Sequence, residues 1–143
     1  MSELAGLLLG GFGGYLIGKT QAGQTVQIPI KGASLISILC FDLVPKSTVK
    51  SYDKTMQGKG RIVGVWVQFY YTTALVDYNV TLNDSNVFNF MSGSAQPISL
   101  HETAVLFPCN APFENGAKLT ITVNNRDTDD SHYIRLAIFV EMS

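Results

Sequence analysis

The sequence is poor in charge. Asp, Glu, Lys and Arg make up 15% of its 143 residues, and the formal net charge is −1, whereas an average protein is about 25% charged. Copies of such a chain repel one another weakly, so the composition favours a surface that is largely covered by neighbours. The lack of a basic excess also argues against specific binding of nucleic acid.

Motifs for catalysis or cofactor binding are also missing. The serines lie in no G-x-S-x-G elbow. Residues 13–20 match G-x-x-x-x-G-K-T literally, but no strand is predicted before them and no parallel α/β pattern follows. Asp127, Asp129 and Asp130 lack the spacing of an EF-hand and fit a solvated turn better. We therefore predict no enzymatic activity, no metal, no cofactor and no small-molecule substrate.

Cysteine is scarce, and its two positions leave two interpretations open. Cys40 and Cys109 have no spacing typical of a metal site, so they either form one disulfide or remain buried thiols that act as small apolar residues. Two glycosylation sequons begin at Asn79 and Asn83. They matter only if the domain is ever outside a cell.

The most unusual stretch is Leu4–Gly18, which is apolar, uncharged and contains six glycines. Residues four apart share one face of a helix, so glycines at every fourth position predict a smooth helical groove of the small-xxx-small kind. Each glycine costs roughly 1 kcal/mol in a helix interior, so the segment needs lipid or packed neighbours. The predicted contact residues are Leu4, Gly6, Leu7, Leu8, Gly10, Phe12, Gly14, Tyr15, Leu16, Ile17 and Gly18.

Two interpretations of this leader remain open. A signal peptide is not expected because no basic residue precedes the apolar run. A helix over Leu4–Ile17 would be about 21 Å long at 1.5 Å per residue, short of the ~30 Å hydrocarbon core, so partial insertion is one interpretation. Packing on identical copies or on a neighbouring subunit is the other. With Lys19–Gln24 as a linker, we predict an arm over residues 1–24 and a β-domain over residues 25–143.

Apolar and polar residues alternate in short stretches along the rest of the chain, as is typical of β-strands. A polar stretch with four lysines, Lys46–Gly60, is predicted to be an exposed loop, and Ser34–Val44 to be a strand buried on both faces. Val63, Val65 and Val67 are predicted to share one face of their strand. The eight predicted strands are Thr25–Ile30, Ser34–Val44, Arg61–Tyr71, Asp77–Leu82, Val87–Phe90, Ile98–Phe107, Leu119–Val123 and His132–Glu141.

Eight short strands without a repeat predict an all-β, eight-stranded antiparallel sandwich, and the hydrophobic last strand favours a jelly roll. A closed lipocalin-like barrel and an immunoglobulin-like sandwich are the alternatives. The second of these is weaker, because no tyrosine corner is present.

The layout of the apolar arm Leu4–Gly18 followed by eight strands resembles single jelly-roll capsid proteins of membrane-containing icosahedral viruses. The resemblance covers the whole chain but is architectural. It implies a virion shell subunit assembled in the host cytoplasm, with copies of itself and other shell proteins as partners. It also implies an arm that reaches neighbours or an internal membrane.

Two other functions stay open at this point. One is a subunit of an extracellular filament or pilus at the cell surface that donates the leader to a neighbour. The other is a membrane-tethered module that binds a carbohydrate or a receptor. All three interpretations use the leader as an attachment segment.

Overall fold

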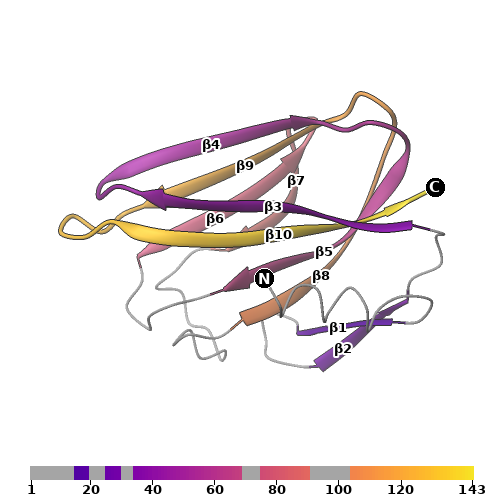
Figure 1. Cartoon of the computed structure of the whole chain (residues 1–143), viewed down its shortest axis with the longest axis horizontal. Helices are drawn as coiled ribbons and strands as arrows, with labels where there is room; N and C mark the ends of the chain where they lie inside the picture. The colour runs from indigo at the N-terminus through magenta and orange to yellow at the C-terminus, as the bar shows by residue number, and fades with distance from the viewer. Residues whose placement is uncertain (1–14, 20–24, 30–33, 69–74, 91–103) are drawn as a thin grey trace.

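The structure is a computed structural model, and it describes residues 15–19, 25–29, 34–68, 75–90 and 104–143. All regular structure in these ranges is β-strand (Figure 1). The strands are β1 (Tyr15–Lys19), β2 (Thr25–Pro29), β3 (Ser34–Val44), β4 (Thr48–Thr55), β5 (Gly60–Gln68), β6 (Val76–Leu82), β7 (Ser85–Phe90), β8 (Ala104–Phe113), β9 (Lys118–Asn125) and β10 (His132–Met142).

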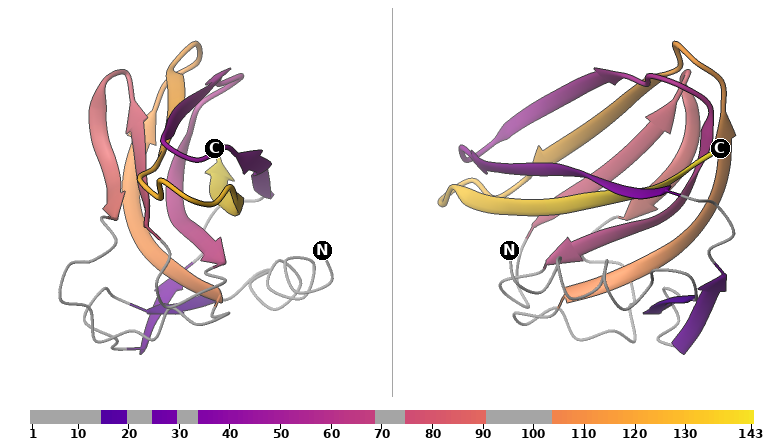
Figure 2. Two further views of the ribbon diagram at one scale, coloured as in Figure 1. Left: turned by 90° about the vertical axis from the view of Figure 1, so that its left-hand side faces the viewer. Right: turned by 45° about the vertical axis from the view of Figure 1, so that its right-hand side comes forward.

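Eight of these strands form two facing antiparallel sheets, as the predicted sandwich requires (Figure 2). One sheet has the order β3-β10-β5-β8 and the other β4-β9-β6-β7. Strands adjacent in a sheet are mostly distant in the chain, because the chain crosses between the sheets at most connections. This interleaved order is that of a jelly roll, so the predicted fold class is confirmed.

The core lies between the two sheets and is almost entirely apolar. Side chains alternate along each strand, so one face of every strand points into this space. The buried residues come from seven of the eight strands, with β4 contributing the half-buried Tyr52, and include Phe90, Ile62, Leu119, Ile134, Leu136 and Ile138. Burying each such side chain contributes about 1.5–3 kcal/mol, which makes this core the main source of stability.

β5 contributes side chains to two apolar clusters, one on each face of its sheet, and it contains a bulge. Phe139 of β10 pairs with Gly64, and Val140 pairs with Ile62, so Val63 is an extra residue on β5. Val63 consequently packs on the outer side of the sheet with Trp66, whereas Val65 and Val67 pack in the core. The prediction that Val63 shares a face with Val65 and Val67 is therefore wrong, because a bulge reverses the alternation.

The predicted loop Lys46–Gly60 is also wrong in its central part, since Thr48–Thr55 forms β4. This strand pairs with β9 over its whole length and lies at the edge of its sheet. An edge strand tolerates lysines even on its inward face, here Lys50 and Lys54, because only one of its sides is enclosed. The polar composition hid the strand for this reason.

The C-terminal part of the leader is a strand and not the end of a helix. Tyr15–Lys19 pairs antiparallel with Thr25–Pro29, in a register that sets Leu16 opposite Ile28 and Gly18 opposite Val26. β1 also lies against β8. The helix prediction is thus wrong for Tyr15–Gly18, where the backbone is paired with β2 in place of a helical turn. Its remaining part, Leu4–Gly14, and the linker residues 20–24 lie outside the described residues.

One further boundary differs between the predicted and the observed strands, and one predicted hairpin is confirmed. The strand that was expected to stop before Pro108 continues to Phe113 as β8. β8 is at a sheet edge, where proline is tolerated because one side of the strand needs no hydrogen bond. The predicted hairpin is confirmed: Asn83 and Asp84 join β6 to β7 with φ angles of 50° and 67°, as a type I′ turn requires.

Candidate interaction surface

The outer face of β3 exposes large apolar side chains. Leu39, Phe41 and Leu43 are 44%, 40% and 41% exposed, although Ser34–Val44 was predicted to be buried on both faces. That prediction is wrong for this face. The strand lies at a sheet edge, and only its inner residues, such as Cys40 and Val44, are buried.

The neighbouring strand β10 extends this apolar surface. Tyr133 pairs with Leu43, and Arg135 pairs with Phe41, so these side chains share the outer face. Tyr133 is 68% exposed, and the Arg135 guanidinium carbon lies 5.7 Å from the centre of the Phe41 ring, within cation–π range. We call Leu39, Phe41, Leu43, Tyr133 and Arg135 the β3–β10 patch.

The β3–β10 patch continues into a buried apolar cluster on the same face. Leu39 pairs with Ala137, which pairs with Trp66, which in turn pairs with Leu106. The last three are buried in the second cluster together with Val63 and Phe139. The outer face of this sheet is therefore apolar from β3 to β8, and it is exposed in the described structure at its β3 end.

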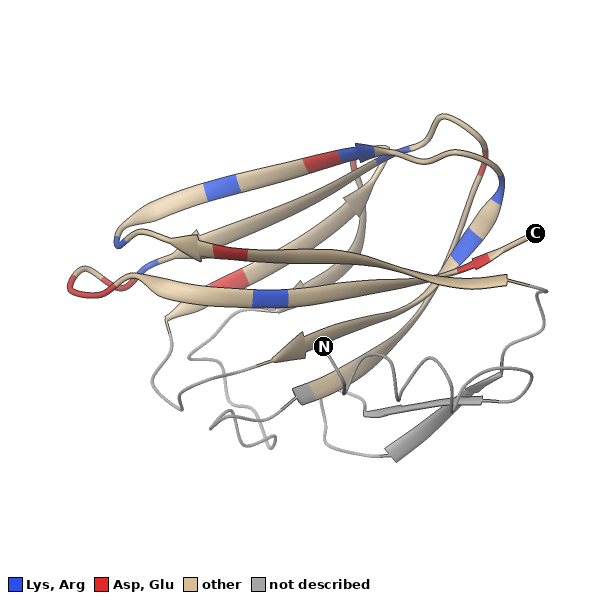
Figure 3. Ribbon diagram, viewed as in Figure 1, with Lys and Arg blue, Asp and Glu red and all other residues tan. Residues whose placement is uncertain are grey.

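The outer face of the other sheet has the opposite character. Cross-strand pairing places polar side chains on it from all four strands, and Ser51 and Thr122 lie 3.3 Å apart through their hydroxyl oxygens. Charged residues are sparse on both sheets (Figure 3), so Asn, Thr and Ser make this face polar. The outward residues described here are Ser51, Asp53, Thr55, Asp77, Asn79, Thr81, Asn86, Asn89, Lys118, Thr120, Thr122 and Asn124, with Val49 as an apolar exception.

Asp42 links the two sheets at their shared open edge. Its Oδ2 accepts hydrogen bonds from Tyr52 Oη at 2.7 Å and from Lys50 Nζ at 3.2 Å, and both donors belong to β4. The Tyr52 bond, the Leu43 amide and Lys50 together hold the pKa of Asp42 below its ordinary value. Burial and, after it, the same hydrogen bond raise the pKa of Tyr52.

The two cysteines do not form a disulfide. Cys40 lies on β3 and Cys109 on β8, at opposite edges of one sheet. Three strand spacings of about 4.8 Å each separate the two edge strands, which sets them roughly 14 Å apart. This is about twice the ~7 Å limit on the distance between the Cα atoms of a disulfide. Burial raises the pKa of each thiol to about 11, so both stay protonated and unreactive at neutral pH.

The acidic turn after β9 is held by its own hydrogen bonds. Asp127 accepts from the amides of Asp129 and Asp130 and contacts His132 Nε2 at 2.8 Å. These contacts hold the pKa of Asp127 below its ordinary value. Among the described residues, no group of three His, Cys, Asp or Glu side chains is placed to hold a metal ion.

The β3–β10 patch as defined above includes none of the contact residues predicted from sequence. Tyr15, Leu16, Ile17 and Gly18 lie on β1, and the remaining seven, from Leu4 to Gly14, lie outside the described residues. Sequence reasoning missed the β3–β10 patch. The available signal was a run with apolar residues at both odd and even positions, which indicates a strand with a second apolar face but not whether that face is covered.

Membrane contact is not tested by the described strands. In the ranges that the structure describes, no helix has the length and apolar character needed to cross a bilayer.

The sequon residues are engaged within the fold: Asn79 Nδ2 donates to Asn86 Oδ1 at 2.6 Å, and Asn83 Oδ1 accepts from the Lys118 amide at 2.9 Å.

Comparison with known proteins identifies no family. No family model matches the chain, and no curated protein matches it in sequence. Two solved structures are similar over most of the chain. One is the exo-beta-1,3-galactanase from Phanerochaete chrysosporium with galactose, at 15% identity over 83% of this chain and 31% of that chain, with a TM-score of 0.39. The other is a structure of infectious bursal disease virus, Gx strain, at 10% identity over 82% of this chain and 33% of that chain, with a TM-score of 0.32.

The chain thus spans about a third of the length of each of these two proteins. At such TM-scores the similarities carry no argument about what this chain does. The function has to be argued from the surface itself.

Proposed function

We propose that the chain is a structural subunit of a virion shell that assembles through the β3–β10 patch. The observation that carries this proposal is the difference between the two outer faces of the sandwich. One exposes Leu39, Phe41, Leu43 and Tyr133, and the other is lined by Asn, Thr and Ser. A subunit of a closed shell needs such a difference, because one surface packs on neighbours and another faces water.

General physical considerations support this assignment. Large exposed apolar patches typically mark interaction sites, and a specific interface buries about 1,200–2,000 Å² in total. The patch supplies an apolar centre with an arginine and a tyrosine, the residue types enriched at such centres. Jelly rolls recur in viral capsids and in lectins. The fold is therefore compatible with the capsid function and also with the alternative of a carbohydrate-binding module.

Several parts of the proposal extend beyond the described residues. In it, the arm that contains Leu4–Gly14 packs on neighbouring subunits or on an internal membrane. The partners are further copies of the chain and other shell proteins, and the location is the virion after assembly in the host cytoplasm. The subunit acts by burying surface and performs no catalysis.

The test compares two double variants of the full-length protein. Leu39→Glu with Leu43→Glu puts two carboxylates on the patch, and Ser51→Glu with Asn89→Glu puts the same charge on exposed positions of the polar face. Electron microscopy and analytical ultracentrifugation should show closed particles or defined rings for the parent and the control, and dispersed subunits for the patch variant. Equal assembly of all three proteins would exclude the patch as the interface.

The same experiment separates the other functions. Fibres in place of shells would favour a filament subunit. Monomers that float with liposomes would favour a membrane-tethered binding module. Deleting residues 1–14, which keeps β1, tests the arm separately, because an unchanged oligomer size would refute its role in assembly.

A further inference from the structure

The open edge of the sandwich contains a cleft that the assembly proposal does not use. It lies between β3 and β4 and has a volume of about 680 Å³. Ile36, Ile38 and Cys40 line it from β3, and Leu119 and Ile121 line it from β9. Small-molecule sites in proteins are commonly clefts of about 300–1,000 Å³ with mostly apolar walls and a few placed polar groups, and this cleft fits that description.

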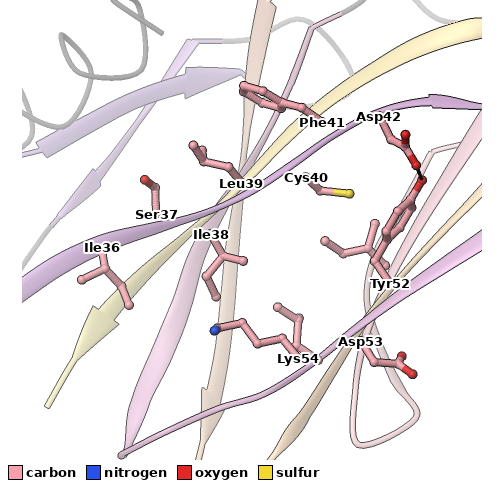
Figure 4. Close-up of a pocket in the computed structure, with 12 residues that line it drawn as sticks. Ile36, Ser37, Ile38, Leu39, Cys40, Phe41, Asp42, Tyr52, Asp53 and Lys54 are labelled. Carbon is pink, nitrogen blue, oxygen red and sulfur yellow. Dashed lines mark hydrogen bonds between the residues drawn. The ribbon is translucent and has the colours of Figure 1, made fainter.

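One end of the cleft is closed by polar contacts. Tyr52 and Lys50 of β4 both reach Asp42 of β3, so the carboxylate at this end is already neutralised by a lysine. Figure 4 shows the hydrogen bond between Tyr52 and Asp42 beside Cys40, with Ile36 and Ile38 farther along β3. Phe41 and Leu39 point to the other side of the strand, toward the β3–β10 patch.

The other end of the cleft carries a lysine whose charge is not compensated. Lys54 pairs with Leu119, on the side of β4 that faces inward, and its side chain extends across the gap toward β3 (Figure 4). Within the described ranges Lys54 forms no ion pair. The other acid beside the cleft, Asp53, faces outward, where Lys118 Nζ lies 3.7 Å from its Oδ2 and Thr120 donates to its Oδ1 at 2.9 Å.

We propose that this cleft binds a straight-chain fatty acid, with the hydrocarbon chain on the isoleucines and the carboxylate on Lys54. Between the polar contacts at Asp42 and the lysine at the other end, the walls are formed by the apolar residues of β3 and β9. Of the charged residues described in the lining, Asp42 and Asp53 are paired with lysines, and Lys54 is the one without an ion pair. A carboxylate satisfies that cation through a charge-assisted hydrogen bond. A neutral amphiphile of the same length leaves the ammonium without a counter-charge.

A purely structural explanation of Lys54 predicts something different. Lysines that point inward on edge strands protect the edge from pairing with other chains. In that case Lys54 would affect association between copies but would not affect the choice of ligand. The two explanations are therefore separated by measuring head-group preference.

The experiment titrates the full-length protein with dodecanoate and with dodecanol, both below the concentrations at which they aggregate, by isothermal calorimetry. We expect dodecanoate to bind roughly tenfold more tightly than dodecanol. Lys54→Met should abolish that preference while keeping apolar binding. Lys46→Met removes a lysine from the β3–β4 turn, outside the cleft, and should keep the preference.

A second variant tests the location of the hydrocarbon chain. Ile36 is 42% exposed at the mouth, so Ile36→Trp fills the entrance without disturbing the core and should weaken binding of both ligands. Equal affinity of the parent for both ligands, an unchanged preference in Lys54→Met, or no effect of Ile36→Trp would each overturn the proposal. The readout is ligand affinity, so assembly through the β3–β10 patch can fail without affecting it.

Discussion

Tyr52 of β4 donates a 2.7 Å hydrogen bond to Asp42 of β3 and thereby joins the edge strands of the two sheets. These two strands are consecutive in the chain but belong to different sheets. The bond therefore holds together the side of the sandwich at which the cleft opens.

This contact predicts a loss of stability in acid. The pKa of Asp42 lies below its ordinary value of 3.8, mainly because of the Tyr52 hydrogen bond. A proton therefore binds the unfolded chain more readily than the folded one, and the stabilisation that is present above the ordinary value is lost as the pH falls below it. Urea unfolding between pH 2 and pH 6 should show a steeper acid loss for the parent than for Asp42→Asn, and parallel curves would contradict the prediction.

Asn125 should be the polar residue whose loss is most damaging to the fold. Its fully buried amide group lies 3.1 Å from each of the carbonyl oxygens of Val44, Pro45 and Asp130, and its Oδ1 accepts from the Asp127 amide. Asn125→Ala leaves these buried groups without a partner and should reduce the free energy of unfolding by about 2–3 kcal/mol. Asn124→Ala, on the polar outer face, is the control and should cost much less in the same denaturant titration.

Gly60 should not tolerate a side chain. A Cβ atom there would lie 2.6 Å from the backbone oxygen of Glu141, whereas a Cβ at Gly64 would meet the flexible end of Leu106 at 2.9 Å. Because backbone moves less easily than a side-chain terminus, Gly60→Ala should destabilise the fold by about 1–3 kcal/mol, and Gly64→Ala by less. Thermal unfolding of both variants checks this order, and a larger loss for Gly64→Ala would refute it.

Both thiols should react slowly in the folded protein. With a pKa of about 11 for Cys40 and for Cys109, about one thiol in a thousand is ionised at pH 8, and only the thiolate attacks. A chromogenic disulfide reagent should thus modify the native protein slowly and both cysteines rapidly in denaturant. A fast phase of one equivalent in the native state would show that one thiol is more accessible than its surroundings suggest.

The sequence predicted the sandwich because most of its strands alternate clearly. In β6 and β9, residues such as Val80 and Ile121 point inward between polar neighbours, and this period of two depends only on having one buried face. The number of strands in the sandwich was also right, but one member was exchanged. Thr25–Pro29 pairs with β1 outside the two main sheets, and the lysine-rich Thr48–Thr55 takes the eighth place.

The errors at β3 and β4 share a physical cause. β3 and β4 lie at sheet edges, where burial no longer dictates composition, so β3 exposes Phe41 and β4 carries Lys54 on its inner face. Local sequence does not report which strand becomes an edge, because that depends on the order in which distant segments pair. The interaction surface and the cleft both lie at this edge, and neither could be predicted from the pattern alone.

The extra residue Val63 in β5 also affects how this strand can be compared between proteins. Before the bulge the inward residue is the even-numbered Ile62, and after it the inward residues are the odd-numbered Val65 and Val67. Removing Val63 would restore a regular alternation, with Ile62, Val65 and Val67 facing inward and Trp66 facing outward. A relative that lacks this insertion therefore keeps the same inward and outward residues and needs a one-residue gap to align. An ungapped alignment through Arg61–Gln68 would match core positions of one protein with surface positions of the other.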